Sequence, residues 1–539
     1  MSVQIEKLFE PLALAGMKIK WLPEVDENGT KLRPFRFTVA NLQCGEVTTY
    51  GCVASPAGKG PFPAILHIHG GGQTCDKQAV CEWGAEGYTA MSFDWTGTGN
   101  TERRPEEVMS APKDFGNEID IPSTPGQFLG HAAARCCLSI LESLPEVDGG
   151  HMGIYGISWG GFLAWLVNGT DPRVKGAVSI YGTGGLFREG HIWDYYWQNL
   201  TRKERNRWLS IMEPASYLHS QNSPMLHINA TNDFFGGVNV AAELLSALPD
   251  SLADFTPNSN HHFGLGSVAL IKAFFNYYLR GGELLPPTPE LKIEESSFDK
   301  VIVSTFDKPD EKVKTEFWFS YGPQPHHSRC WDRHNNAVVK NDRIIFELNS
   351  GGPLWFFIRK YYPENGISIS SIPACIRSFQ GSPVPSPVLF SGGSLKGIGI
   401  QWGTEIRHAG EVGELFDVCN EGIMPKGTDG SFKELLFRGP AAPESMSWPD
   451  KTTLIVKLEN AASLDIVAWG HFNCRNQKSF NAKIAPVTDH EIILTPADFK
   501  SADGKSPGDF SFVETFELSG TSLSGKKLLI KYLGWGNHR

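Results

Sequence analysis

The first half of the chain alternates short apolar runs with stretches whose apolar residues recur at a helical period. The runs end in glycine or polar residues, which is typical of strands that are buried in a parallel sheet. Helical spacing covers 130–144, 161–168 and 238–248, and an antiparallel hairpin over Phe35–Ala54 leads in. This alternation predicts an α/β fold with a doubly wound sheet. The runs are Pro63–His69, Tyr88–Asp94, Met152–Gly156, Val174–Tyr181, Pro224–Ala230 and Leu252–Thr256.

The second half has a different pattern. A Pro-rich stretch at 284–289 is typical of a stiff linker, and β-type runs separated by turns follow it without strong amphipathic helices. A second seam falls at 381–387. We therefore predict an α/β domain over 1–285, one β-sandwich over 290–380 and another over 385–539. The β-type runs are Lys314–Tyr321, Arg343–Leu348, Leu354–Arg359, Thr453–Leu458, Ser463–Trp469 and Lys526–Tyr532.

Length and composition narrow the classes of protein. At about 150 residues per domain, 539 residues predict two to four domains. An apolar content of 41% excludes a disordered scaffold, and a net charge of −10 argues against a basic nucleic-acid binder or a membrane-surface protein. We expect neither nucleic acid nor membrane as a partner, and a homo-oligomer stays open.

The N-terminus carries no signal-peptide pattern, and the ten cysteines form no CxxC pair. Both features predict a cytoplasmic protein. A chain whose signal peptide had been trimmed would look the same, so a secreted or periplasmic protein is the alternative.

The sharpest motif is Gly156-Ile157-Ser158-Trp159-Gly160, which matches G-x-S-x-G. It follows a predicted strand and precedes a predicted helix. Glycines there permit the tight turn that lifts a serine hydroxyl above the edge of the sheet, and the helix N-terminus adds backbone N–H groups. The motif predicts that Ser158 is a catalytic nucleophile.

A glycine loop, His69-Gly70-Gly71-Gly72, follows an earlier strand. Such a loop lets backbone N–H groups approach a developing oxyanion, and the residue after the nucleophile supplies a second donor. We predict an oxyanion hole formed by the amides of Gly71 and Trp159, with the amide of Gly72 as the next candidate donor.

A serine nucleophile needs a base and an orienting acid, and in this architecture they follow in the order acid, then histidine. Asp233 comes directly after the run Pro224–Ala230, and two histidines, His261 and His262, come after Leu252–Thr256. We predict Asp233 as the acid. We favour His261 as the base because it comes first, and we expect His262 to line the pocket or to pack.

Other patterns give weaker indications. His67 and His69 share one face of a strand but have no third ligand nearby, so we predict no metal and no cofactor. An aromatic-rich segment between Val174–Tyr181 and Pro224–Ala230 predicts a short cap at about 185–215. We expect Trp193, Tyr196 and Trp197 in this cap to line the substrate pocket, although packing of the cap explains such rings equally well.

Taken together, HGGG, DWTGTGN, GISWGG, TNDFF and NSNHHFG occur in the order found in the α/β-hydrolase superfamily. Residues 35–280 resemble its acetyl xylan esterase and dienelactone hydrolase-like branch, although dienelactone hydrolases use cysteine where this chain has Ser158. The resemblance implies a Ser-His-Asp mechanism carried by Ser158, His261 and Asp233. Residues 290–380 resemble a fibronectin- or immunoglobulin-like sandwich, and 385–539 resemble a jelly roll of the carbohydrate-binding kind.

Three functions follow from these features. The first is a serine esterase that forms an acyl-enzyme on short, acetyl-type esters of small molecules or carbohydrates. The second is a serine peptidase of the X-prolyl dipeptidyl peptidase or prolyl oligopeptidase type, although only about 60 residues precede HGGG, too few for a propeller. The third is a non-catalytic carbohydrate-binding protein, against which the intact set of three residues argues.

Overall fold

The computed structural model describes residues 17–537 with gaps. The predicted pocket residues Trp193, Tyr196 and Trp197, and the seam at 381–387, lie outside the described residues. The gaps are 28, 42–44, 96–124, 186–200, 249, 298–299, 307, 322–325, 327–328, 330, 335–336, 350–352, 378–387, 393–397, 403–407, 411–414, 427–430, 439–450, 471–477, 488–489 and 524–527.

A mixed sheet forms the centre of the first half, and the predicted doubly wound α/β arrangement is confirmed. Six neighbouring strands are parallel, in the order β6-β5-β7-β8-β9-β10. The antiparallel hairpin β3–β4 joins this sheet through β6. The strands are β1 (Ile19–Trp21), β2 (Val25–Glu27), β3 (Thr30–Asn41), β4 (Gly45–Ala54), β5 (Phe62–Ile68), β6 (Thr89–Phe93), β7 (Val147–Ile157), β8 (Val174–Ile180), β9 (Met225–Ala230) and β10 (Leu252–Thr256).

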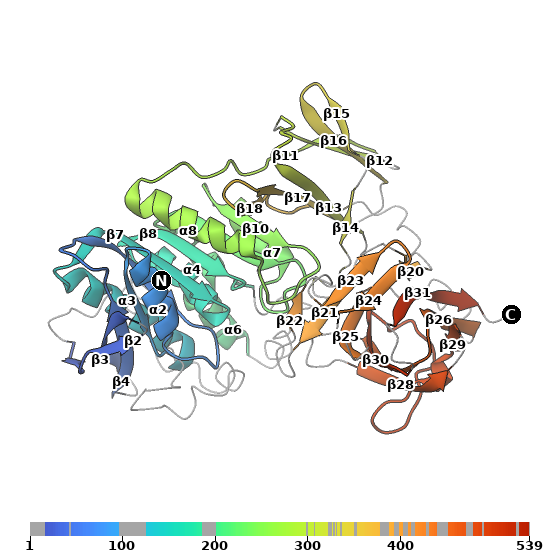
Figure 1. Ribbon diagram of the computed structural model, residues 1–539. Helices are drawn as coiled ribbons and strands as arrows, with labels where there is room; N and C mark the ends of the chain where they lie inside the picture. The colour runs from blue at the N-terminus through green and yellow to red at the C-terminus, as the bar shows by residue number, and fades with distance from the viewer. Residues whose placement is uncertain are drawn as a thin grey trace.

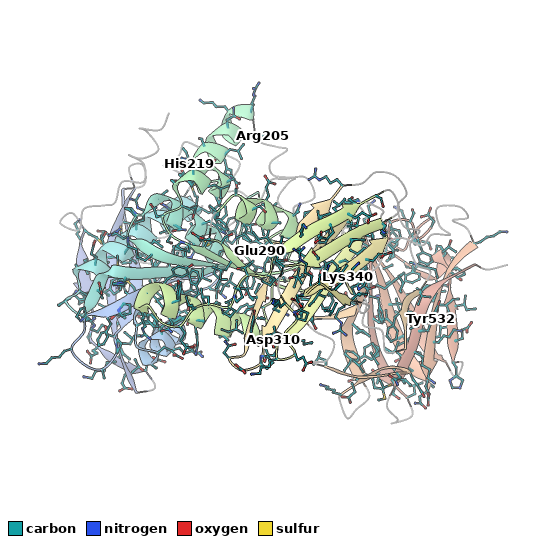
Figure 2. The ribbon with its side chains drawn as sticks, turned by 90° about the horizontal axis from the view of Figure 1, so that it is seen from above. Arg205, His219, Glu290, Asp310, Lys340 and Tyr532 are labelled. Carbon is teal, nitrogen blue, oxygen red and sulfur yellow. The ribbon has the colours of Figure 1, made fainter. Side chains whose placement is uncertain are left out.

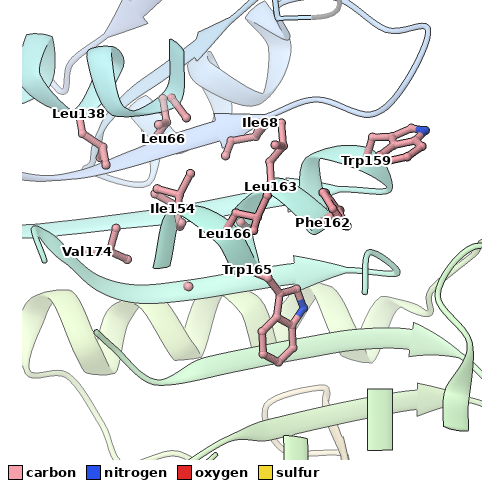
Figure 3. Close-up of a cluster of buried hydrophobic side chains, with 14 of the residues drawn as sticks. Leu66, Ile68, Leu138, Ile154, Trp159, Phe162, Leu163, Trp165, Leu166 and Val174 are labelled. Carbon is pink, nitrogen blue, oxygen red and sulfur yellow. The ribbon is translucent and has the colours of Figure 1, made fainter. Parts of the chain in front are cut away.

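Helices cover both faces of this sheet (Figure 1). One core contains apolar residues of α3, α4 and α7, and the core on the opposite face contains those of α2 and α8. Figure 3 shows α4 side chains such as Leu163 and Leu166 against Leu66 of β5 and Ile154 of β7. The helices are α2 (Lys77–Ala85), α3 (Pro125–Ser143), α4 (Trp159–Thr170), α6 (Arg202–Ile211), α7 (Val238–Ser246) and α8 (Leu265–Arg280), with the 3-10 helix η4 (Pro214–Ser220).

The central sheet continues beyond the linker at 284–289. β18 pairs with β10 through Ala253 and Ser370, and β17, β13 and β14 extend the same sheet. A continuous sheet therefore crosses the predicted boundary near 285–290. The sequence pattern, which indicated a separate sandwich over 290–380, did not predict this continuity. These strands are β13 (Lys314–Tyr321), β14 (Asp332–Arg333), β17 (Leu354–Tyr362), β18 (Ile367–Ser370) and β19 (Ala374–Ile376).

A second, four-stranded sheet packs on this extension, with Phe317, Phe346 and Phe356 in the shared core. Figure 2 shows this region, marked by Glu290 and Lys340, between the α/β part and the C-terminal part that carries Tyr532. Its strands are β11 (Leu291–Ser296), β12 (Lys300–Thr305), β15 (Val338–Lys340) and β16 (Arg343–Asn349).

In its described residues, the C-terminal part consists of two six-stranded antiparallel sheets that enclose one apolar core. Leu454 and Leu533 reach this core from one sheet, and Leu464 and Leu518 reach it from the other, which is consistent with the predicted β-sandwich. The first sheet contains β20 (Val388–Ser391), β23 (Phe416–Cys419), β24 (Gly422–Pro425), β26 (Thr452–Glu459), β29 (Glu491–Leu494) and β31 (Leu529–Asn537). The second contains β21 (Ile398–Trp402), β22 (His408–Gly410), β25 (Ser431–Arg438), β27 (Ala462–Gly470), β28 (Lys478–Val487) and β30 (Thr515–Ser522).

Candidate active site

Ser158 lies at a sharp turn between β7 and α4. Its backbone has φ 57° and ψ −119°, a conformation that costs energy for a residue with a side chain. The two motif glycines make the turn possible, because a Cβ on Gly156 would lie 2.0 Å from the Gly160 carbonyl oxygen. A Cβ on Gly160 would lie 2.1 Å from the Ile68 oxygen. The motif therefore presents a partly exposed serine at the carboxyl end of the sheet.

The structure brings Ser158, His261 and Asp233 together. His261 Nε2 lies 3.1 Å from Ser158 Oγ, and His261 Nδ1 lies 2.9 Å from Asp233 Oδ2. The adjacent His262 is partly exposed, and its ring stacks on Phe263 with centroids 6.3 Å apart. Of the two histidines that the sequence offers, His261 is thus the one in the geometry of a general base.

Asp233 is fully buried and is held as a carboxylate. Burial alone would raise its pKa, but the charge and hydrogen bond of His261 oppose this effect, and the pKa is lowered overall. The amides of Phe235 and Gly236 contribute, donating to Asp233 Oδ1 at 2.8 and 2.5 Å. A carboxylate that accepts from a ring N–H and two amides can orient the imidazole and stabilise its protonated form.

The loops that carry Asp233 and His261 are joined by hydrogen bonds from backbone amides. Asn232 N donates to Ser259 O at 3.0 Å, and Phe234 N donates to Asn260 Oδ1 at 2.9 Å. His261 itself has a φ of 48°, in the left-handed region. The position of its ring therefore depends on how firmly the surrounding loop is held.

Three aromatic rings surround His261, and the sequence analysis did not single them out. The centroids of Tyr181, Phe234 and Phe235 lie 4.2, 4.6 and 6.4 Å from that of the imidazole. Each follows the end of a strand or the acid itself, a position that could have indicated them. They pack around a base that is only 5% exposed.

The glycine loop after β5 lies against the start of α4. Gln73 N donates to Gly70 O at 3.3 Å, Gly70 N donates to Gln73 Oε1 at 2.7 Å, and Gly72 takes a φ of +73°. A Cβ on Gly71 would lie 2.7 Å from Trp159 Cδ1, and one on Gly70 would lie 3.3 Å from Ser158 Cβ. The two chain segments that the sequence names as oxyanion donors are therefore neighbours beside the serine.

His67 and His69 are buried beneath this loop. His67 Nδ1 lies 3.2 Å from Ser92 Oγ, and His69 Nδ1 donates to Gly70 O at 2.7 Å. Burial lowers the pKa of each ring to about 4, so both are neutral at pH 7. Within the described part of the chain, no group of three or more His, Cys, Asp or Glu side chains could hold a metal ion.

Part of the predicted cap is described. Trp208 of α6 is fully buried and stacks on Phe162 of α4, with centroids 6.3 Å apart. Glu213 accepts a hydrogen bond from Gly185 N at 2.8 Å, which connects the two ends of the predicted cap. Trp208 therefore packs the cap onto the domain, while Figure 2 shows Arg205 of the same helix projecting outward.

The parallel sheet, the turn at Ser158 and the loops after β9 and β10 define an α/β-hydrolase-type fold. Residues 50–262, from β4 to the histidine pair, match the model of the Dienelactone hydrolase family. This match spans less than half of the chain and includes every described candidate residue. It supports a hydrolase.

Three solved structures are similar to part of this chain at low sequence identity. An acetyl xylan esterase from Thermoanaerobacterium is 16% identical over 51% of this chain and 92% of that chain, with a TM-score of 0.41. An acetyl xylan esterase from Paenibacillus is 17% identical over 51% and 93%, with a TM-score of 0.43. A dienelactone hydrolase-like protein from Klebsiella pneumoniae is 18% identical over 46% and 99%, with a TM-score of 0.33. No curated protein matches the sequence.

The described helices contain none that is both long and apolar enough to cross a membrane.

Proposed function

We propose that this protein is a serine carboxylic ester hydrolase that works through an acyl-enzyme. The observation that carries the proposal is the 3.1 Å distance from His261 Nε2 to Ser158 Oγ, combined with the 2.9 Å contact of the same ring with Asp233. A serine hydroxyl is a poor nucleophile alone, and a neighbouring base with an orienting acid activates it.

In this mechanism Ser158 Oγ attacks the ester carbonyl while its proton passes to His261 Nε2. Asp233 stabilises the imidazolium, and the amides of Trp159 and Gly71, with Gly72 nearby, bind the oxyanion. His261 then gives the proton to the leaving alcohol, and an acyl group stays on Ser158. Water, deprotonated by His261, hydrolyses this ester and releases the acid.

The substrate we propose is a short-chain, acetyl-type ester. The Phe235 ring lies 4.8 Å from that of Trp159, the residue after Ser158, and 6.4 Å from that of His261. These aromatic neighbours support a small acyl group as the first one to test. An acetylated carbohydrate is the first alcohol component to test, in line with the sequence resemblance to the acetyl xylan esterase branch.

For the trailing region we propose immunoglobulin-like and jelly-roll sandwiches with a structural or dimer-contact role. Binding of full-length Ser158→Ala protein to insoluble polysaccharide would argue instead for a carbohydrate-binding module.

The test is hydrolysis of p-nitrophenyl esters of increasing acyl length, acetylated sugars and a chromogenic Pro-amide by wild-type and Ser158→Ala protein. We expect the acetyl ester to be cleaved fastest and the variant to be inactive. Activity of the variant at the wild-type rate would contradict the mechanism. Faster cleavage of the Pro-amide than of any ester would identify a peptidase.

A further inference from the structure

A segment from beyond the predicted catalytic domain contacts both loops of the candidate active site. We call it the bracing segment and define it by its described residues His326, Arg329 and Trp331, between β13 and β14. The sequence predicted no role for this segment. The contacts it makes are hydrogen bonds to two asparagines, Asn232 and Asn258, which neighbour the catalytic acid and base.

Asn232 directly precedes Asp233 and is fully buried. Its Nδ2 group donates to Arg329 O at 2.6 Å and to His326 O at 3.2 Å. Its Oδ1 accepts from Thr231 Oγ1 at 2.9 Å. The side chain therefore fixes the acid-bearing loop to two carbonyl groups of the bracing segment.

Asn258 lies three residues before His261, at the start of its loop. Its Nδ2 donates to Trp331 O at 2.9 Å while its Oδ1 accepts from Trp331 N at 3.0 Å. The asparagine thus pairs with the Trp331 backbone as a neighbouring strand would. Its own backbone N donates to Thr231 Oγ1 at 2.9 Å, which connects the two catalytic loops.

The bracing segment is itself firmly anchored. Trp331 is fully buried and packs on Phe357 of β17, with centroids 5.1 Å apart. Phe357 in turn contacts Phe255 of β10 at 6.1 Å. The anchor therefore belongs to the extension of the central sheet and shares the core of the α/β part.

We propose that Asn232 and Asn258 are positioning residues, through which the bracing segment sets the geometry of Asp233 and His261. This inference rests on the proposed esterase function. His261 has a left-handed backbone conformation, so its loop tolerates little displacement. A misplacement of about 1 Å at a reacting group costs on the order of 100-fold in rate.

Two substitutions test this inference in the full-length protein. Asn232→Asp keeps size and shape but turns the donor that faces two carbonyls into an acceptor. Asn258→Gly tolerates the φ of 54° at that position and removes both hydrogen bonds to Trp331. For each we expect kcat on p-nitrophenyl acetate to fall by about 10- to 100-fold, with KM nearly unchanged, because only the catalytic groups move.

Asn168→Asp is the matched control. Asn168 is equally buried, and its Nδ2 donates to Gln221 Oε1 at 2.7 Å and to Ser223 O at 3.0 Å, away from the bracing segment. It should lower the melting temperature to a similar extent and leave kcat per folded molecule unchanged. A fall of kcat in the control equal to that in Asn232→Asp and Asn258→Gly would overturn the inference.

Reaction of Ser158 with a fluorophosphonate separates this inference from the proposed function. We expect wild type to be labelled rapidly and Asn232→Asp and Asn258→Gly slowly while remaining folded. Wild-type labelling together with wild-type rates in both variants would overturn the positioning role alone. Wild-type protein that neither labels at Ser158 nor cleaves esters would overturn the esterase proposal and this inference with it.

Discussion

At the scale of single residues, the candidate site depends on positions where a side chain cannot be tolerated. The turn at Ser158 forces φ to 57°; the Gly160 backbone closes around Gly156, and the end of β5 closes around Gly160. Local sequence could predict this turn because its cause is local. Local sequence could place Tyr181 and Phe234 after strand ends, but it could not place their rings around His261, because separate loops bring the three residues together.

Gly160→Ala should abolish activity and lower stability. The added methyl group would lie 2.1 Å from the Ile68 carbonyl oxygen, which belongs to β5 and cannot yield easily. Thermal melting and p-nitrophenyl acetate hydrolysis measure the two effects. Gly508→Ala is the control, since a Cβ there meets nothing within 4 Å. Equal melting temperatures and equal activities of the two variants would show that the turn at Ser158 can accommodate a methyl group at residue 160.

The two adjacent histidines should differ sharply in their effect on catalysis. His261→Ala removes the ring that contacts both Ser158 and Asp233, so we expect kcat/KM to fall by about 10³-fold or more. His262→Ala should stay near the wild-type rate, because the His262 ring stacks on Phe263. Steady-state kinetics of both variants decide the assignment, and the reverse result would assign the base to His262.

At the scale of elements, β10 connects the α/β part to the sheet extension through a buried carboxylate. Asp254 of β10 accepts from Arg359 Nε at 2.8 Å and from the hydroxyls of Ser267 and Ser368, each at 2.6 Å. Burial raises the pKa of Asp254, but Arg359 and these hydroxyls oppose it and lower the pKa overall. The element pattern predicted β10 itself, yet not its partner β18, because the two pair across more than a hundred residues.

Asp254→Asn should destabilise the protein by about 3–5 kcal/mol at pH 7, because it leaves Arg359, whose side chain is only 14% exposed, without its carboxylate. The folded pKa of Asp254 is depressed, so its stabilisation is present above about pH 3.9, the unfolded value. It is lost as pH falls through the folded pKa. Urea unfolding at several pH values should therefore show that the difference in free energy of unfolding between wild type and variant becomes smaller below about pH 4.

Asp148→Asn is the control for this pH series. The Asp148 side chain is 39% exposed, and its partners His151 and Gly150 lie on the same turn, so its loss should change stability little. If the destabilisation by Asp254→Asn stays the same from pH 7 to below pH 4, this would contradict the stabilising role of the Asp254–Arg359 pair.

At the scale of the whole molecule, apolar cores group the strands into two blocks. The central sheet and its extension share cores up to residue 376, whereas the C-terminal sheets enclose a core of their own. The predicted three-part division stays a prediction. The continuous sheet nevertheless implies that the first two predicted domains unfold as one unit.

Calorimetry should therefore resolve two unfolding transitions. Asp254→Asn should lower only the transition of the α/β part with its extension. Leu454→Ala opens a cavity in the separate C-terminal core. It should lower only the temperature of the C-terminal transition, through a loss of about 2–5 kcal/mol in the stability of that part. A single transition shifted by both variants would contradict this division.

The sequence by itself determined the local features: buried strands, the tight turn at Ser158, and the chain order of serine, acid and histidine. These follow from side-chain periodicity and from glycines whose steric role is decided within a few residues. Tertiary structure alone decided that β18 extends the sheet, that His261 rather than His262 reaches Ser158, and that a distant segment holds Asn232 and Asn258. Strand partners and loop contacts depend on surfaces brought together by folding, and residue order does not record which of several similar surfaces will meet.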